Sequence, residues 1–177
     1  MSVLAGPFAI ACALLAVGGA LKAVRPGDTA NALAALGVRA PRTFARGAVR
    51  AGGAIEAVIG VAALLTGAAV LVALVALSYL AFAVFVVVAL RSGTPLASCG
   101  CFGKVDTPPS VVHVVIDLTF AGVAAAAAVM GEVALPDVLS EQPLAGVPFV
   151  LLLGVGCYLV FQAVTALPKS MAAIGGA

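Results

Sequence analysis

An all-α integral membrane protein is the fold class that the sequence predicts: a bundle of about five transmembrane helices, with an amphipathic surface segment after the first. Hydrophobic residues make up 64% of the 177 positions, and charged residues only 9%. Because an ordinary soluble domain carries about 25% charged residues, this chain lacks the polar surface that water requires. Its apolar residues form long runs, and about 20 residues suffice for one helix to cross a bilayer. We therefore expect residues 1–177 to form one transmembrane domain in contact with lipid, with no nucleic-acid partner.

The first apolar run, residues 3–24, is interrupted only by Lys22 near its end. No basic residue precedes this run, whereas a secretory signal normally begins with one. We therefore expect the run to be retained as the first span.

Residues 25–50 form the predicted amphipathic segment. Pro26 and Gly27 end the first helix, and arginines then alternate with apolar side chains. This pattern predicts one or two short helices on the membrane surface, divided near Pro41. One interpretation is an anchor to anionic lipid, and the alternative is a docking surface for an acidic partner.

The next apolar run, residues 53–90, is too long for one crossing, because at 1.5 Å per residue it would reach about 55 Å. A break at Thr66-Gly67 divides it into two spans. A polar loop at residues 91–109 follows and contains Cys99 and Cys101. The five predicted spans are residues 3–24, 53–66, 68–90, 110–130 and 144–167.

Charge placement supports this layout, because it puts every lysine and arginine on one face of the membrane. These residues are Lys22, Arg25, Arg39, Arg42, Arg46, Arg50, Arg91, Lys104 and Lys169. The opposite face holds Glu132, Asp137 and Glu141. Basic residues accumulate on the cytoplasmic side of short loops. The sequence therefore predicts a multi-pass protein of the cell (plasma) membrane, with its N-terminus outside and its C-terminus and cysteine loop in the cytoplasm.

Cys99 and Cys101 flank a single glycine in the polar loop. Residues two apart lie about 5.5–7 Å from each other at Cα, near the upper end of the disulfide range. Gly100 relieves the turn, and a strained, exposed disulfide of this kind is typical of labile, catalytic pairs. Two thiolates for one metal ion are the alternative, although His113 is the only histidine and a closed tetrahedral site needs four donors. A turn with inert thiols is the third interpretation.

Two carboxylates, Glu56 and Asp117, lie within predicted spans, and His113 precedes Asp117 by four residues on the same helix face. Carboxylates at membrane depth are costly and usually face the bundle interior, where they mark proton or substrate paths. We therefore regard Glu56, His113 and Asp117 as candidate proton partners of the cysteine pair. The alternative is structural pairing, of Glu56 with an arginine such as Arg50 or Arg91, and of Asp117 with His113 or Lys104.

Four further residues lie within the spans. Tyr158 and Gln162 could contact a quinone headgroup, or they could hydrogen-bond between helices. Cys12 and Cys157 could pair or relay electrons, or they could be small apolar fillers.

The string CGCFG at residues 99–103, with Lys22 ending the first span and Glu56 early in the second, resembles the MauE family within the DoxX-like membrane proteins. The resemblance covers most of the chain and implies a four-helix core plus a fifth span, tied to thiol–disulfide chemistry. It implies that Cys99 and Cys101 are the redox pair, and that Lys22 and Glu56 are recurrent polar positions. The name-giving member is implicated in maturing a disulfide-rich methylamine dehydrogenase subunit, alongside a thioredoxin-like partner.

These observations favour a membrane thiol–disulfide oxidoreductase component. Its cysteine pair would exchange with a thioredoxin-like protein and pass electrons into or across the membrane, to quinone or a second cysteine pair, in the maturation of a membrane or secreted client. The alternatives are a soft-metal transporter that uses the two thiolates, and a non-catalytic subunit whose basic segment docks a partner enzyme. The predicted cytoplasmic cysteine loop conflicts with maturation outside the cell, unless the protein moves electrons outward or the family departs from the positive-inside rule.

Overall fold

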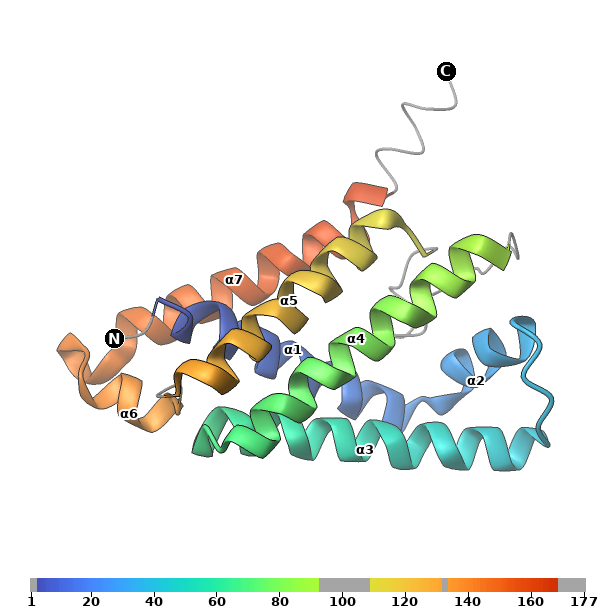
Figure 1. Cartoon of the computed structure of the whole chain (residues 1–177), viewed down its shortest axis with the longest axis horizontal. Helices are drawn as coiled ribbons and strands as arrows, with labels where there is room; N and C mark the ends of the chain where they lie inside the picture. Colours follow the sequence, from blue (N-terminus) through green and yellow to red (C-terminus); the bar gives the residue numbers. More distant parts are fainter. Residues whose placement is uncertain (1–2, 93–108, 132–133, 169–177) are drawn as a thin grey trace, which may run out of the picture.

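The computed structural model describes residues 3–92, 109–131 and 134–168. Within these ranges the chain forms helices and no strand, as Figure 1 shows. The helices are α1 (Ala5–Val24), α2 (Pro26–Ala35), α3 (Arg42–Thr66), α4 (Ala69–Ser92), α5 (Val111–Met130), α6 (Leu135–Ser140), the 3-10 helix η2 (Pro143–Gly146) and α7 (Val147–Thr165). Five of them, α1, α3, α4, α5 and α7, are long and apolar enough to cross a membrane. The predicted all-α membrane bundle is therefore confirmed.

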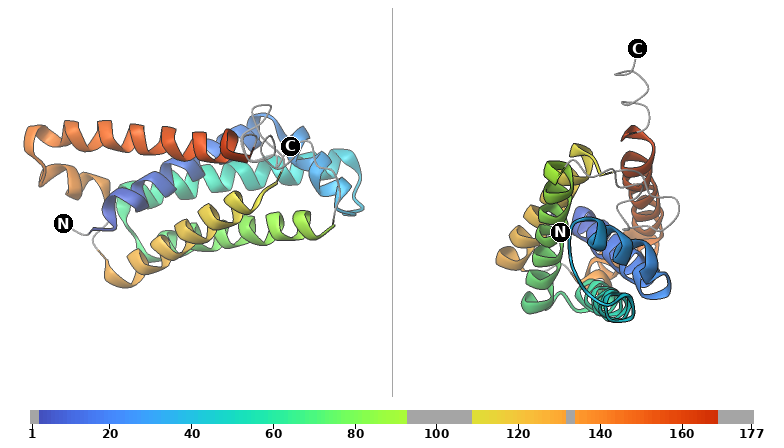
Figure 2. Two further views of the ribbon diagram at one scale, coloured as in Figure 1. Left: turned by 90° about the horizontal axis from the view of Figure 1, so that it is seen from above. Right: turned by 90° about the vertical axis from the view of Figure 1, so that its right-hand side faces the viewer.

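Two helix pairs make up most of the bundle. Helix α1 packs along α3, and α4 packs along α5, while α7 lies along the outside and contacts mainly α1 (Figure 2). The buried core lies between the two pairs, and Phe8, Cys12, Val72 and Val75 are fully buried there. Tyr79 of α4 also lies in this core, where its hydroxyl donates to the carbonyl oxygen of Ala11 at 2.7 Å.

Glycines bring the backbones of α1 and α3 into direct contact. A Cβ added at Gly53 would lie 2.6 Å from the carbonyl oxygen of Gly19, and one added at Gly60 would lie 2.7 Å from that of Cys12. No side chain fits at either position. Such contacts hold helices together in lipid, where the hydrophobic effect does not favour their association.

Helix α3 begins earlier than the sequence predicts. It starts at Arg42 directly after Pro41, and the expected boundary near residue 53 is absent. Gly53 lies inside α3, where the absence of a side chain allows the close contact with α1. The surface segment after the first span therefore consists of α2, the connection that follows it, and the first turns of α3. At its other end α3 stops at Thr66, where the sequence predicts a break, and Gly67 takes a left-handed conformation with φ 60°.

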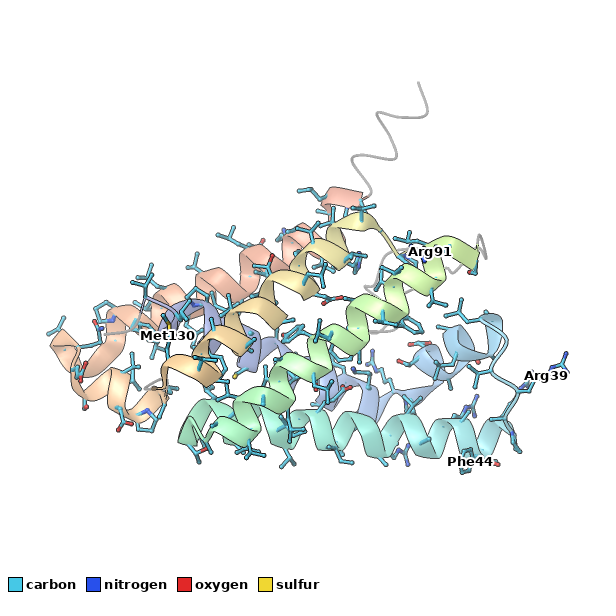
Figure 3. The ribbon with its side chains drawn as sticks, viewed as in Figure 1. Arg39, Phe44, Arg91 and Met130 are labelled. Carbon is cyan, nitrogen blue, oxygen red and sulfur yellow. The ribbon has the colours of Figure 1, made fainter. Side chains whose placement is uncertain are left out.

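The molecule has two chemically different ends. We call the end formed by α2, the first turns of α3, the last turns of α1 and α4, and the start of α5 the basic end. Every lysine and arginine in the described ranges lies there, and Figure 3 labels Arg39 and Arg91. At the opposite end, near Met130 in the same view, α6 contributes Asp137 and Glu141 follows it. Lys104, Glu132 and Lys169 lie outside the described residues.

Candidate functional site

An ion pair joins α1 to α3 inside the bundle. The ammonium group of Lys22, in the last turn of α1, contacts the carboxylate of Glu56 in α3. Lys22 is only 8% exposed, and its Nζ also lies 4.1 Å from the ring centroid of Phe82 in α4. A carboxylate partner and an aromatic face both lower the cost of holding a lysine away from water.

The backbone contact between the two helices sets this pairing. A Cβ added at Gly53 would lie 2.8 Å from Cβ of Lys22, so Lys22 begins directly beside α3. Glu56 is three residues from Gly53 and is therefore on the same helix face. The structural alternative paired Glu56 with an arginine such as Arg50 or Arg91, and the ion pair with Lys22 shows that this choice of partner is wrong. The side chain of Arg50 instead donates through Nε to the carbonyl oxygen of Ala23 at 3.1 Å.

A cavity of about 50 Å³ lies beside Lys22, between α1, α4, α5 and α7. Asp117 of α5 and Lys22 of α1 both line it. Its remaining polar or aromatic lining includes Tyr79, Phe82, His113 and Phe120. Its lining is mainly apolar apart from Lys22, Tyr79, His113 and Asp117, and its volume has room for a few water molecules beside these groups.

His113 enters the cavity from the start of α5. It is 4% exposed, and its Nδ1 shares a hydrogen bond of 2.9 Å with the hydroxyl of Ser110. Ser110 is the residue before α5, so this bond ties the imidazole to the beginning of the helix. His113 and Asp117 therefore line one cavity from successive turns of the same helix.

Glu56 belongs to a second cavity, of about 200 Å³, between α1, α2, α3 and α4. Lys22 and Phe82 line both cavities. Helix α2 contributes Thr29 and Leu33 to the second cavity. We call the group Lys22, Glu56, His113 and Asp117 the polar site. It joins three helices around one buried ammonium group.

The family comparison covers this whole arrangement. The family model described as methylamine utilisation protein MauE matches residues 1–131, which include α1 to α5 and the polar site. The chain belongs to the MauE family. No curated protein matches the chain, and no solved structure does. The family match and the five apolar helices together identify a multi-pass membrane protein.

The structure describes some of the remaining predicted site residues of this MauE-family protein and not others. Cys99 and Cys101 lie outside the described residues. Tyr158 and Gln162 lie on the outer surface of α7, where Gln162 Nε2 donates to the Tyr158 hydroxyl at 3.0 Å. Tyr158 is 60% exposed, so the structure does not bring this pair to the polar site. Val160, on another face of α7, lines the cavity instead.

The two described cysteines, Cys12 and Cys157, are both free thiols. Cys12 is fully buried in the core, and Cys157 is partly buried against it. Both positions match the interpretation of small apolar fillers. Among the described residues, no group of three or more His, Cys, Asp or Glu side chains is arranged to hold a metal ion.

Sequence reasoning missed the two aromatic residues that shape the polar site. Tyr79 is one of only two tyrosines in the chain and lies in the middle of an aliphatic span. A buried tyrosine usually has a hydrogen-bond partner, so its position was a usable signal for an interior face of α4. Phe82, one turn later, lies on that same face, and the two rings are 5.9 Å apart.

Proposed function

We propose that this MauE-family protein is a membrane thiol–disulfide redox protein in which Cys99 and Cys101 alternate between a disulfide and two thiols. One observation supports this above the others. In the sequence the two cysteines lie between Ser92, which ends α4, and Ser110, which precedes α5. Both of these helix ends belong to the basic end, where the polar site also lies. The helix ends that flank the cysteine pair in the sequence, and the candidate proton groups His113 and Asp117, therefore share one end of the bundle.

The proposed exchange transfers two electrons. A thiolate of a reduced thioredoxin-like protein attacks the Cys99–Cys101 disulfide, which forms a mixed disulfide and releases one cysteine thiolate. The second thiol of the partner then displaces the other cysteine, so the partner leaves with a disulfide and the pair becomes two thiols. A lipid-soluble quinone takes two electrons and two protons from the pair and becomes a quinol, which restores the disulfide.

The polar site supplies the proton partners in this proposal. Glu56 and Lys22 form an ion pair, so Glu56 is already engaged by a partner of opposite charge. Asp117 and His113 face the cavity, where water can connect them. Carboxylates and histidines inside a membrane commonly form proton relays. Asp117 and His113 are therefore the residues that we assign to accept the two protons released when the pair is oxidised and to pass them on to the quinone.

A thiol titration tests the proposal. Purified protein is equilibrated in buffers of increasing oxidising potential, and its free thiols are counted by alkylation and mass spectrometry. Cys99 and Cys101 should be lost together at one two-electron midpoint, and Cys99→Ser should leave Cys101 free throughout. The matched control, Cys12→Ser, should leave that midpoint unchanged. A pair that stays reduced at every potential and retains a soft metal through purification would instead identify a metal transporter.

We further propose that the basic end faces the cytoplasm at the plasma membrane. The supporting observation is that every described lysine and arginine lies at that end. A cytoplasmic thioredoxin-like partner would then supply the electrons, and the quinol that receives them would carry them outward within the membrane, toward the maturation of a membrane or secreted client. In sealed vesicles of known orientation, a membrane-impermeant maleimide should label Cys99 from the cytoplasmic side alone. Labelling from the outer side alone would reverse this orientation while leaving the redox proposal standing.

A further inference from the structure

Helix α3 is longer than the hydrocarbon layer that it crosses. Its 25 residues span about 37 Å, whereas the hydrocarbon core of a bilayer is about 30 Å thick. Twenty residues counted back from Thr66 end at Gly47. The turn that contains Arg42 and Arg46 therefore lies at the depth of the lipid headgroups.

A groove of about 380 Å³ runs between α2 and these first turns of α3. Arg42 and Arg46 line it from α3, four residues apart on one helix face, and Asn31 lines it from α2. The apolar residues of the groove are Leu33, Val38, Phe44 and Val49, with several alanines. None of the lining residues is acidic, and in the described ranges no carboxylate pairs with either arginine. The groove thus combines two positive side chains with an apolar floor.

We propose that this groove binds one anionic phospholipid, with its phosphate between Arg42 and Arg46 and an acyl chain along the apolar floor. Guanidinium groups match phosphate oxygens in pairs of hydrogen bonds. Phe44 is 69% exposed and Val38 51%, and Figure 3 shows Phe44 at the outer end of α3. Exposed apolar side chains among arginines at headgroup depth fit a lipid, because a free phosphate or an acidic protein surface would use only the charges.

Native mass spectrometry of the full-length protein tests this site. The protein is released from detergent in the presence of phosphatidylglycerol or phosphatidylcholine with identical acyl chains. We expect one phosphatidylglycerol to remain bound at least tenfold more often than phosphatidylcholine. The double variant Arg42→Gln/Arg46→Gln should lose this preference. The matched control Arg25→Gln/Arg91→Gln removes two exposed arginines from the same end but outside the groove, and it should keep the preference.

Several outcomes would overturn the proposal. An equal loss in both double variants would show general attraction to the basic end and no defined site. Displacement of the lipid by inorganic phosphate at equal concentration would show that the apolar floor contributes nothing. Displacement by a soluble polyglutamate peptide would favour an acidic protein partner. Phe44→Ser, which keeps every charge, should weaken lipid binding several-fold without changing binding of glycerol phosphate, and unchanged lipid binding would contradict the assigned chain path.

Discussion

Helices α1 and α7 are both apolar and long enough to span a membrane, yet they occupy opposite situations in the molecule. Helix α1 is buried along α3 through Gly19, Gly53 and Gly60, and it brings Lys22 into the interior. Helix α7 is exposed along most of its length and places Tyr158 on its outer surface. Hydrophobicity alone therefore does not determine which helix is packed, because lipid is as apolar as a protein interior. For α1, the packing depends on the glycines at its contact with α3 and on the charged Lys22 side chain that pairs with Glu56.

The family match also separates α1 from α7, because it includes the first helix and excludes the last. It covers α1 to α5, which contain the whole polar site, and it ends before α6 and α7. The contrast between the packed helices α1 to α5 and the more exposed helix α7 leads to four predictions, which follow in order of decreasing effect.

Removing one charge of the Lys22–Glu56 ion pair should cause the largest loss, measured as the free energy of unfolding. Glu56→Gln leaves the Lys22 ammonium without its partner in the bundle, and removing one member of a buried pair costs about 3–5 kcal/mol. Reversible unfolding in mixed micelles of increasing denaturing detergent measures this loss. The double variant Lys22→Met/Glu56→Leu should recover most of the stability, because apolar residues of similar volume replace a buried ion pair at little cost. A double variant no more stable than Glu56→Gln would contradict the pairing.

Removing the cavity carboxylate should slow the redox cycle with less effect on folding. Asp117→Asn keeps the shape of the side chain but removes its capacity to accept a proton. We expect reoxidation of the reduced Cys99–Cys101 pair in quinone-containing vesicles to slow about 100-fold, the lower range for general acid–base catalysis. Quenched-flow alkylation measures this rate. Asp137→Asn, an exposed carboxylate of α6 at the opposite end, is the matched control and should react normally. Equal rates for all three proteins would remove Asp117 from the mechanism.

A glycine-to-alanine substitution in α3, which packs against α1, and the same substitution in α7 test the difference in packing directly. Gly53→Ala places a Cβ against the backbone of α1, and overpacking of this kind costs about 1–3 kcal/mol. A Cβ added at Gly154 of α7 meets no atom within 4 Å, so Gly154→Ala should cost no stability, and loss of a glycine inside a helix should add up to about 1 kcal/mol. The same detergent titration compares them. Similar losses in both variants would show that α7 is packed as tightly as α3.

The sequence predicted the five-helix bundle and the turn at Thr66, because these depend on apolar length and on a glycine with positive φ. It also predicted that Glu56 and Asp117 lie within spans, but it did not identify the partner of Glu56. That partner depends on how closely α1 approaches α3. In a chain that is apolar on all faces, helical periodicity does not separate the buried face from the lipid face. The roles of Tyr79 and Phe82 as cavity walls were missed for the same reason.

The smallest effect is expected on the outer face of α7. Gln162 donates a hydrogen bond to Tyr158 on an exposed surface, and changes at such positions usually alter stability by less than about 0.5 kcal/mol. Gln162→Ala should therefore unfold like the unmodified protein and reoxidise its cysteine pair at the same rate. The quinone-dependent assay used for Asp117→Asn is the decisive measurement, because the sequence also suggested Tyr158 and Gln162 as quinone contacts. If Gln162→Ala raises the quinone concentration needed for half-maximal reoxidation without affecting stability, then quinone binds outside the bundle on α7, and this loosely packed helix has a functional role of its own.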